Sequence, residues 1–133
     1  VEIHGLVVTP FEVEHPQGAA GYRVDGPSAS IGFVTDHEAG TERDASIVQA
    51  IRGVDVLIHD AQYTPDERSI RRGWGHSTWE GAVDAAEAAG AGRLLLTSLD
   101  PGTTDDGVDT ILTLARRRFP DTGIAFPGVE VSL

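Results

Sequence analysis

The sequence contains no cysteine, no lysine and no methionine, and only 6% of its residues are aromatic. Without cysteine the chain can form neither a disulfide framework nor a thiolate metal site, so any metal ion must be held by histidine and carboxylate side chains. The ten basic residues are all arginine, which we attribute to genome composition and to nothing structural. Because the sequence does not begin with methionine, we expect it to be a fragment of a longer protein.

Long apolar segments are also missing. No apolar run reaches about 18 residues, the length that indicates a transmembrane helix, and no secretory signal peptide is recognisable. We therefore expect a cytoplasmic protein without a membrane partner. The 133 residues suit a single domain, residues 1–133, and an apolar share of 40% is ordinary for a folded chain.

Acidic residues outnumber basic residues by 21 to 10, which gives a formal net charge of −11. An acidic surface repels the phosphates of nucleic acids unless a local basic patch overrides it, so we do not expect a nucleic acid partner. The only basic run is residues 116–118, all arginine. We interpret this run as a helix end, where the helix dipole favours positive charge; a phosphate-binding patch is the less favoured alternative.

The pattern of apolar residues changes after the first third of the chain. Alternating residues predict strands at 6–14, 21–25 and 30–35. Helical periodicity then predicts helices at 44–52 and 105–119, and a capping box at 77–80 opens a third helix that ends near Gly90 or Gly92. Short apolar runs predict further strands at 54–59, 93–98 and 129–133. Strands that alternate with helices indicate an α/β fold, here with an antiparallel portion at the start.

Two residues at predicted strand ends are candidate metal ligands. His15 precedes Pro16 and a glycine-rich bend, and an imidazole in such a place suits a metal ion. Asp36 stands where the strand at 30–35 ends, and a carboxylate there can bridge two hard cations. Taken singly, the more common alternatives are a hydrogen-bonded surface histidine for His15 and a turn or helix-capping aspartate for Asp36.

Asp60 and His76 form a second candidate site. Asp60 ends the apolar run at 54–59, and His76 precedes the capping box of the alanine-rich helix. A carboxylate that accepts from one imidazole nitrogen fixes the tautomer and raises the basicity of the ring, so the pair can pass a proton. A structural hydrogen bond across the loop fits the spacing equally well. Trp74 and Trp79 flank His76; we interpret both as packing residues, with a pocket wall as the less favoured alternative.

Five segments in this order resemble the metallo-β-lactamase superfamily, most closely its phosphodiesterase-like and tRNA 3′-processing endonuclease (RNase Z-like) branches. Each motif is weak by itself, but the ordered set is specific. The segments are residues 13–23 (VEHPQGAAGYR), 33–38 (FVTDHE), 57–63 with 74–78 (LIHDAQY and WGHST), 94–101 (LLLTSLDP) and 126–131 (FPGVEV).

The resemblance implies one half of an αββα sandwich, a mixed sheet with helices on one face. It implies that His15 and Asp36 bind zinc or another divalent metal, and that Asp60 and His76 are a proton-transfer pair. Two departures reduce this site. The upstream motif His-x-His-x-Asp-His is absent, and Ser98 stands where the family has its last metal-binding histidine. Since two ligands do not make a zinc site, we expect the isolated chain to bind zinc weakly or not at all and to catalyse no hydrolysis alone.

The resemblance leaves two functions open for the parent protein. The first is a metal-dependent hydrolase of phosphodiesters or related esters, acting on a small phosphoester. The second is a sensor, regulatory or interaction domain that has lost its metals, which Ser98 and the missing upstream motif favour. A lone half would also expose an apolar sheet face, which folded monomers avoid. We therefore expect the missing N-terminal half, a second copy or another domain to cover that face.

Overall fold

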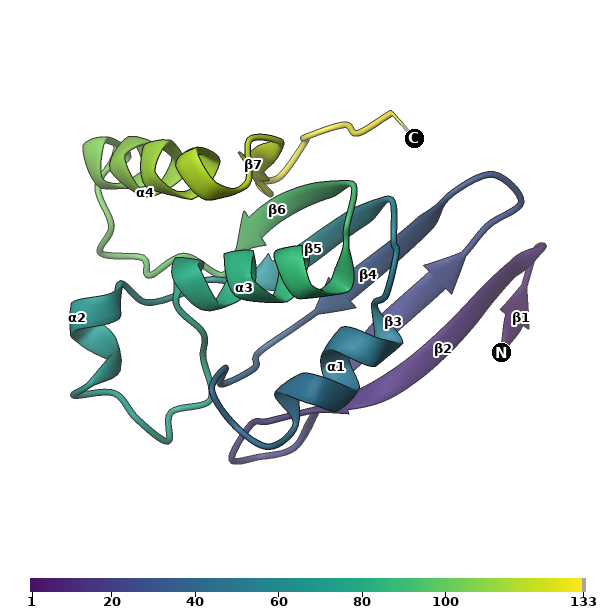
Figure 1. Ribbon diagram of the computed structural model, residues 1–133, viewed down its shortest axis with the longest axis horizontal. Helices are drawn as coiled ribbons and strands as arrows, with labels where there is room; N and C mark the ends of the chain where they lie inside the picture. The colour runs from purple at the N-terminus through teal and green to yellow at the C-terminus, as the bar shows by residue number, and fades with distance from the viewer. Residues whose placement is uncertain (133) are drawn as a thin grey trace.

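The computed structural model describes residues 1–132, which form one mixed seven-stranded sheet with helices packed on it (Figure 1). The strands lie side by side in chain order: β1 Glu2–Ile3, β2 Leu6–Val13, β3 Ala19–Asp25, β4 Ser30–Val34, β5 Val56–Asp60, β6 Arg93–Thr97 and β7 Thr122–Ile124. The helices are α1 Asp44–Ala50, α2 Pro65–Arg68, α3 Trp79–Ala89 and α4 Asp105–Arg118. The pairings from β1 to β4 are antiparallel and those from β4 to β7 are parallel. The predicted α/β class with an antiparallel start is confirmed.

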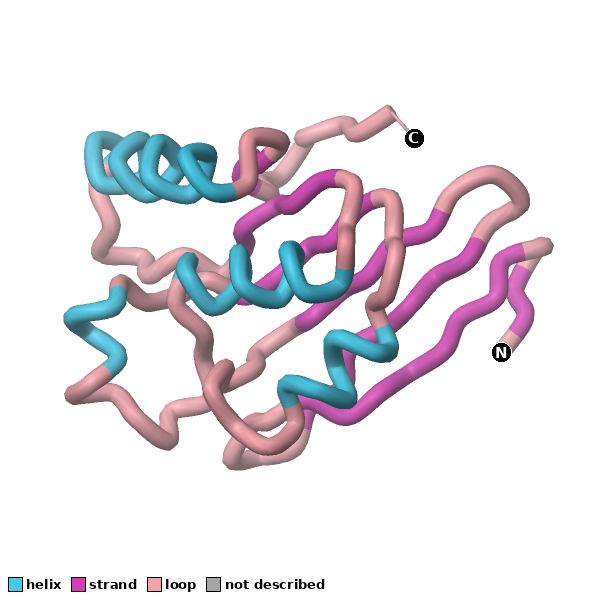
Figure 2. Tube along the Cα trace, viewed as in Figure 1, coloured by secondary structure: helices cyan, strands magenta, loops and turns pink. Residues whose placement is uncertain are grey.

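Helices α1, α3 and α4 share one face of the sheet. The parallel strands β4 to β7 are added in one direction, and crossovers of the same hand then place every connecting helix on the same side. Ile47 of α1, Ala86 of α3 and Ile111 of α4 belong to one buried cluster, together with Leu57 and Leu94 of the sheet. Figure 2 shows α1 and α3 crossing in front of the strands. This arrangement is the predicted layering of helices on one face.

The two long helices begin and end as their sequences dictate. The N-cap of α3 is Thr78, whose hydroxyl accepts from the N–H of Gly81 at 3.1 Å, and the helix ends at Gly90 in the left-handed conformation. The predicted capping box was therefore placed one residue early, at Ser77. Helix α4 ends with the three arginines, and Arg118 pairs with carboxylates of α3. The basic run is thus a helix end, as predicted.

The predicted strand at 129–133 is wrong for its described part. Residues 129–132 form no strand, and residue 133 lies outside the described residues. The last strand is β7, which pairs with β6 and ends where Ala125 N–H donates to Leu96 C=O at 2.9 Å. The chain then turns through Pro127 and Gly128 and leaves the sheet, because Val129 N–H bonds back to Phe126 rather than to a strand. The short helix α2 was not predicted.

The face of the sheet opposite the helices carries an apolar row. Tyr22, Phe33, Ile58 and Leu95 occupy matching register positions on four neighbouring strands. Their side chains point away from the helical core because successive residues of a strand alternate between faces. The exposed fractions of Tyr22 and Phe33 are 40% and 38%, high for large apolar side chains. The sequence predicted such an apolar face.

Within residues 1–132, no helix has the length and apolar character needed to cross a bilayer.

Candidate active site

The topology brings the four predicted site residues to one edge of the sheet. Strands β2 and β4 are both antiparallel to β3, so they run in the same direction, and β5 runs parallel to β4. Their carboxyl ends therefore meet at one edge, as expected of functional sites in such sheets. His15 and Asp36 follow β2 and β4, Asp60 ends β5, and His76 reaches the same edge from the loop before α3.

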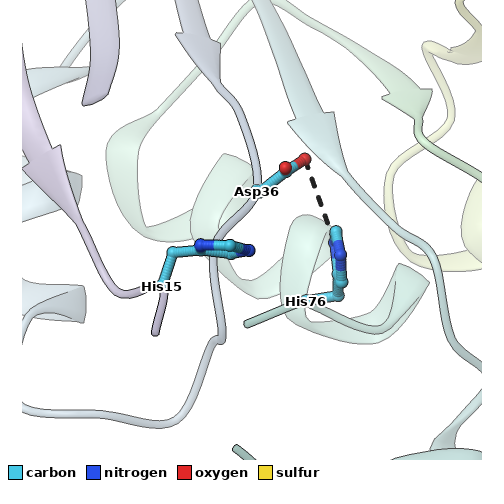
Figure 3. A group of neighbouring side chains, drawn as sticks. All are labelled: His15, Asp36 and His76. Carbon is cyan, nitrogen blue, oxygen red and sulfur yellow. Dashed lines mark ion pairs between the residues drawn. The ribbon is translucent and has the colours of Figure 1, made fainter. Parts of the chain in front are cut away.

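His15, Asp36 and His76 converge on one small volume (Figure 3). One ligand atom from each of the three lies within 4.8 Å of the other two. The imidazole rings of His15 and His76 meet edge to face, with centroids 5.8 Å apart. Two imidazoles and a carboxylate are the ligand types of catalytic zinc sites, whose ligand atoms stand about 3.4 Å apart. Small movements of the side chains would therefore close this trio around an ion. Sequence reasoning placed only two of these residues at a metal.

The second predicted pair also meets. Nδ1 of His76 lies 3.0 Å from the carboxylate of Asp60, which has no exposed surface. The same carboxylate accepts from the backbone N–H groups of His37, Ser77 and Gln62, at 3.0–3.2 Å. Burial raises the pKa of Asp60 to about 6, although the N–H groups of Ser77 and His37 act in the opposite direction. The bond to Asp60 occupies Nδ1 of His76 and leaves Nε2 for a proton or an ion.

Glu38 connects the two halves of this site and was not identified from the sequence. Its carboxylate accepts from the N–H of Gly73 at 2.9 Å and from the N–H of Gly75 at 3.1 Å. Both glycines have positive φ, and a Cβ on Gly75 would overlap the ring of His15. Glu38 thus ties the loop that carries His76 to the strand end that carries Asp36. The only sign of this contact in the sequence is the pair Gly73 and Gly75, which stand just before His76.

The end of β6, where the sequence has serine in place of the family's last metal-binding histidine, has an unusual backbone conformation. Ser98 follows this strand and adopts a positive φ of 58°, which is uncommon for a residue other than glycine. The His15–Asp36–His76 trio includes no ligand from β6. The candidate metal ligands at this edge therefore come from the ends of β2 and β4 and from the loop before α3.

Two further histidines are buried behind the site. Nδ1 of His37 accepts from the N–H of Glu14, and its Nε2 lies 3.4 Å from Asp44. His59 is 1% exposed, and its Nδ1 donates to the backbone carbonyl of Asp60 at 2.7 Å. Burial lowers the pKa of His59 to about 4, with the bond to Asp60 opposing and the nearby His37 assisting this shift. His59 is therefore neutral in the folded protein at neutral pH.

The burial of neutral His59 predicts a loss of stability in acid. The unfolded chain binds a proton at this residue near pH 6.5 and the folded chain only near pH 4, so the free energy of unfolding falls as the pH drops through that window. We expect the stability advantage of the wild type over His59→Asn, which keeps a donor but cannot titrate, to shrink by about 3 kcal/mol between pH 7.5 and pH 4. Urea unfolding of both proteins at each pH measures it. The raised pKa of Asp60 has the opposite effect, but it is present in both proteins and cancels in the difference. A difference that does not change with pH would contradict the buried neutral state.

The chain is similar to proteins of one superfamily. Residues 1–97 match the family model described as the beta-lactamase superfamily domain. A ribonuclease Z from Lacticaseibacillus casei is 33% identical over 81 residues, which are 61% of this chain and 25% of that protein. The metallo-beta-lactamase fold protein YhfI from Bacillus subtilis superposes with a TM-score of 0.80 at 22% identity, over 97% of this chain and 50% of YhfI.

A second solved structure has the same fold. Zn(2+)-bound PqqB from Methylobacterium extorquens superposes with a TM-score of 0.71 at 19% identity, over 98% of this chain and 52% of PqqB. The chain thus spans between a quarter and about half of the length of these proteins. The resemblance seen in the sequence motifs, including that to the RNase Z-like branch, is confirmed. The chain belongs to the beta-lactamase superfamily, as a hydrolase-like domain of the metallo-β-lactamase fold.

Proposed function

We propose that this chain carries part of the active site of a metal-dependent phosphodiester hydrolase. The observation that supports the proposal is the convergence of four side chains, His15, Asp36, Asp60 and His76, at one sheet edge. In this proposal His15 and Asp36 hold the metal, and Asp60 orients His76, which passes a proton to the leaving group. A bound zinc or other divalent ion would supply the activated water and neutralise developing charge. The remaining ligands would come from the part of the parent protein that this chain does not span.

We propose a small phosphoester as the substrate. The ribonuclease Z relatives are named for RNA, yet the net charge of this chain is −11, and an acidic surface weakens binding to polyanions. A small substrate carries few phosphates and is much less affected by this field. The apolar row Tyr22–Phe33–Ile58–Leu95, in which Tyr22 and Phe33 are exposed, is then the surface on which we place the missing half of the parent protein.

A second role for His76 deserves a separate test, because its side chain lies in the trio as well as beside Asp60. A metal-bound imidazole commonly donates its other N–H to a carboxylate, and His76 already makes that bond. His76 is thus placed equally well to be a third metal ligand. If the chain holds no metal at all, the sensor or interaction domain becomes the better account, as Ser98 in place of the last histidine suggests.

Zinc titration of the isolated chain separates these roles. We expect one weakly bound zinc ion, since three ligands make a poorer site than four. A neutral His15 that binds zinc through Nε2 carries its proton on Nδ1, so Nδ1 can no longer accept the 3.3 Å hydrogen bond from Gln17 N–H, and this loss weakens binding further. Calorimetry should show that His15→Ala and Asp36→Asn each abolish this binding. His76→Ala should abolish it if His76 is the third ligand; if His76 only carries a proton, His15 and Asp36 alone make no zinc site, and the wild-type chain should bind no zinc either. The exposed His4 provides the matched control, His4→Ala. Equal zinc binding by the His15, Asp36 and His4 variants would contradict the metal site.

A further inference from the structure

Trp74 is exposed beside the candidate active site. Its exposed fraction is 62%, whereas that of Trp79 is 7%. The prediction that both tryptophans are packing residues is therefore right for Trp79 and wrong for Trp74. Trp74 stands two residues before His76, and the intervening Gly75 packs directly against the ring of His15. A large apolar ring is thus held in solvent next to the groups that converge at the sheet edge.

The backbone that carries this ring is anchored, although the ring itself is not buried. Glu38 binds the backbone N–H groups on both sides of it, at Gly73 and Gly75. The guanidinium of Arg71 lies 5.9 Å from the ring centre of Trp74 and 4.9 Å from that of the buried Tyr63. Asp100 in turn holds Arg71 at 2.9 Å.

An aromatic ring on an anchored loop loses less backbone entropy on binding than one on a mobile loop, which favours a preorganised contact surface. The same loop also offers a free positive charge. Arg72 is exposed and makes no ion pair among residues 1–132, whereas the neighbouring Arg71 is already paired with Asp100. An aromatic ring and a guanidinium two residues apart on one loop match a ligand that combines a flat ring with a phosphate.

We propose that Trp74 is the platform on which the aromatic ring of a phosphoester substrate stacks, with Arg72 beside it for a phosphate oxygen. The ring is a nucleobase or an aryl group, since either presents the flat face that an indole binds. This inference rests on the proposed function, because it names the substrate class of the same site. It makes Trp74 a specificity-determining residue and assigns it no part in the chemical step.

Calorimetric titrations of the chain in the presence of a chelator test the platform without any turnover. The ligands are adenosine 5′-monophosphate, phenyl phosphate and, as the ring-free control, ribose 5-phosphate. We expect Trp74→Ala to weaken binding of the nucleotide or of both ring-bearing ligands by about 5- to 150-fold, and to leave ribose 5-phosphate unchanged. Trp74→Phe should keep most of the affinity, and Arg72→Ala should weaken all three alike. Because Trp74 is exposed, neither of its variants should affect folding.

The outcomes are distinct. A loss confined to the nucleotide identifies a nucleobase, and a loss for both ring-bearing ligands identifies any aryl group; both support the platform. Equal binding of all three ligands by the wild type, no binding of the ring-bearing ligands, or no effect of Trp74→Ala would each overturn it. In those cases Trp74 is better explained as a contact for another part of the parent protein. Since no metal is present, failure here leaves the proposed hydrolase intact, and failure of zinc binding leaves this result unaffected.

Discussion

Replacing His76 by alanine in the complete parent protein is expected to lower kcat for a phosphodiester about 10²- to 10⁴-fold, the usual contribution of a positioned acid–base group. The free energy of unfolding should change little. The side chain of His76 is 18% exposed, and Asp60 keeps the backbone N–H groups of His37, Ser77 and Gln62 after the imidazole is lost. Steady-state kinetics and urea unfolding of the same preparations give both quantities.

The matched control is His76→Gln. Glutamine can still donate a hydrogen bond to Asp60, but it cannot carry a proton between the carboxylate and a leaving group. If it is as stable as the wild type while kcat remains low, His76 acts in proton transfer. If His76→Ala lowers stability by several kcal/mol and kcat falls only in proportion to the folded fraction, the pair is structural and the assignment of the site is wrong.

Asp60→Ala is expected to destabilise the isolated chain by about 2–6 kcal/mol, because each buried N–H left without an acceptor costs about 1–3 kcal/mol. The N–H groups of His37 and Ser77 both bond to Asp60 within the buried interior. Typical domains have a free energy of unfolding of about 5–15 kcal/mol, so the substitution would remove a large part of it. Urea unfolding at pH 7.5 measures the change.

The control for Asp60 is Asp60→Asn, which keeps one acceptor oxygen and nearly the same volume. We expect it to lie between the wild type and Asp60→Ala in stability. A loss below 1 kcal/mol for Asp60→Ala would mean that the N–H groups of His37 and Ser77 find other partners, and that the carboxylate is not needed to hold the loop before α3.

Most of the fold was predictable because its signals are local. Alternation along β2 and the helical period of α4 depend on neighbours in sequence, and both elements lie within a residue of the prediction. The strand expected at 129–133 failed because β7 is selected by its pairing with β6, a contact between distant residues. Residues 129–133 alternate apolar and polar side chains and so resemble a strand more than Thr122-Gly123-Ile124 does, and only the pairing with β6 selects the latter.

The candidate site was predictable only in part. Strand ends placed His15, Asp36 and Asp60 at one edge, since the direction of each strand follows from the order of the elements. The contact of His76 with Asp60 was predicted, but the place of His76 in the metal trio depends on the path of the loop from β5 to α3, which the sequence does not specify. The carboxylate of Glu38 fixes that path through two backbone N–H groups, and such contacts leave no pattern in side-chain type.

The order of the strands has a consequence for how the chain folds. Every strand from β2 to β7 pairs with the strand that precedes it in the sequence, so each new element docks on a surface that is already built. Pairings between consecutive strands close shorter loops than pairings between strands further apart in the sequence, and they form faster. The sheet can therefore grow in the direction of synthesis, with β1 to β4 assembled before the residues of β6 and β7 have emerged from the ribosome.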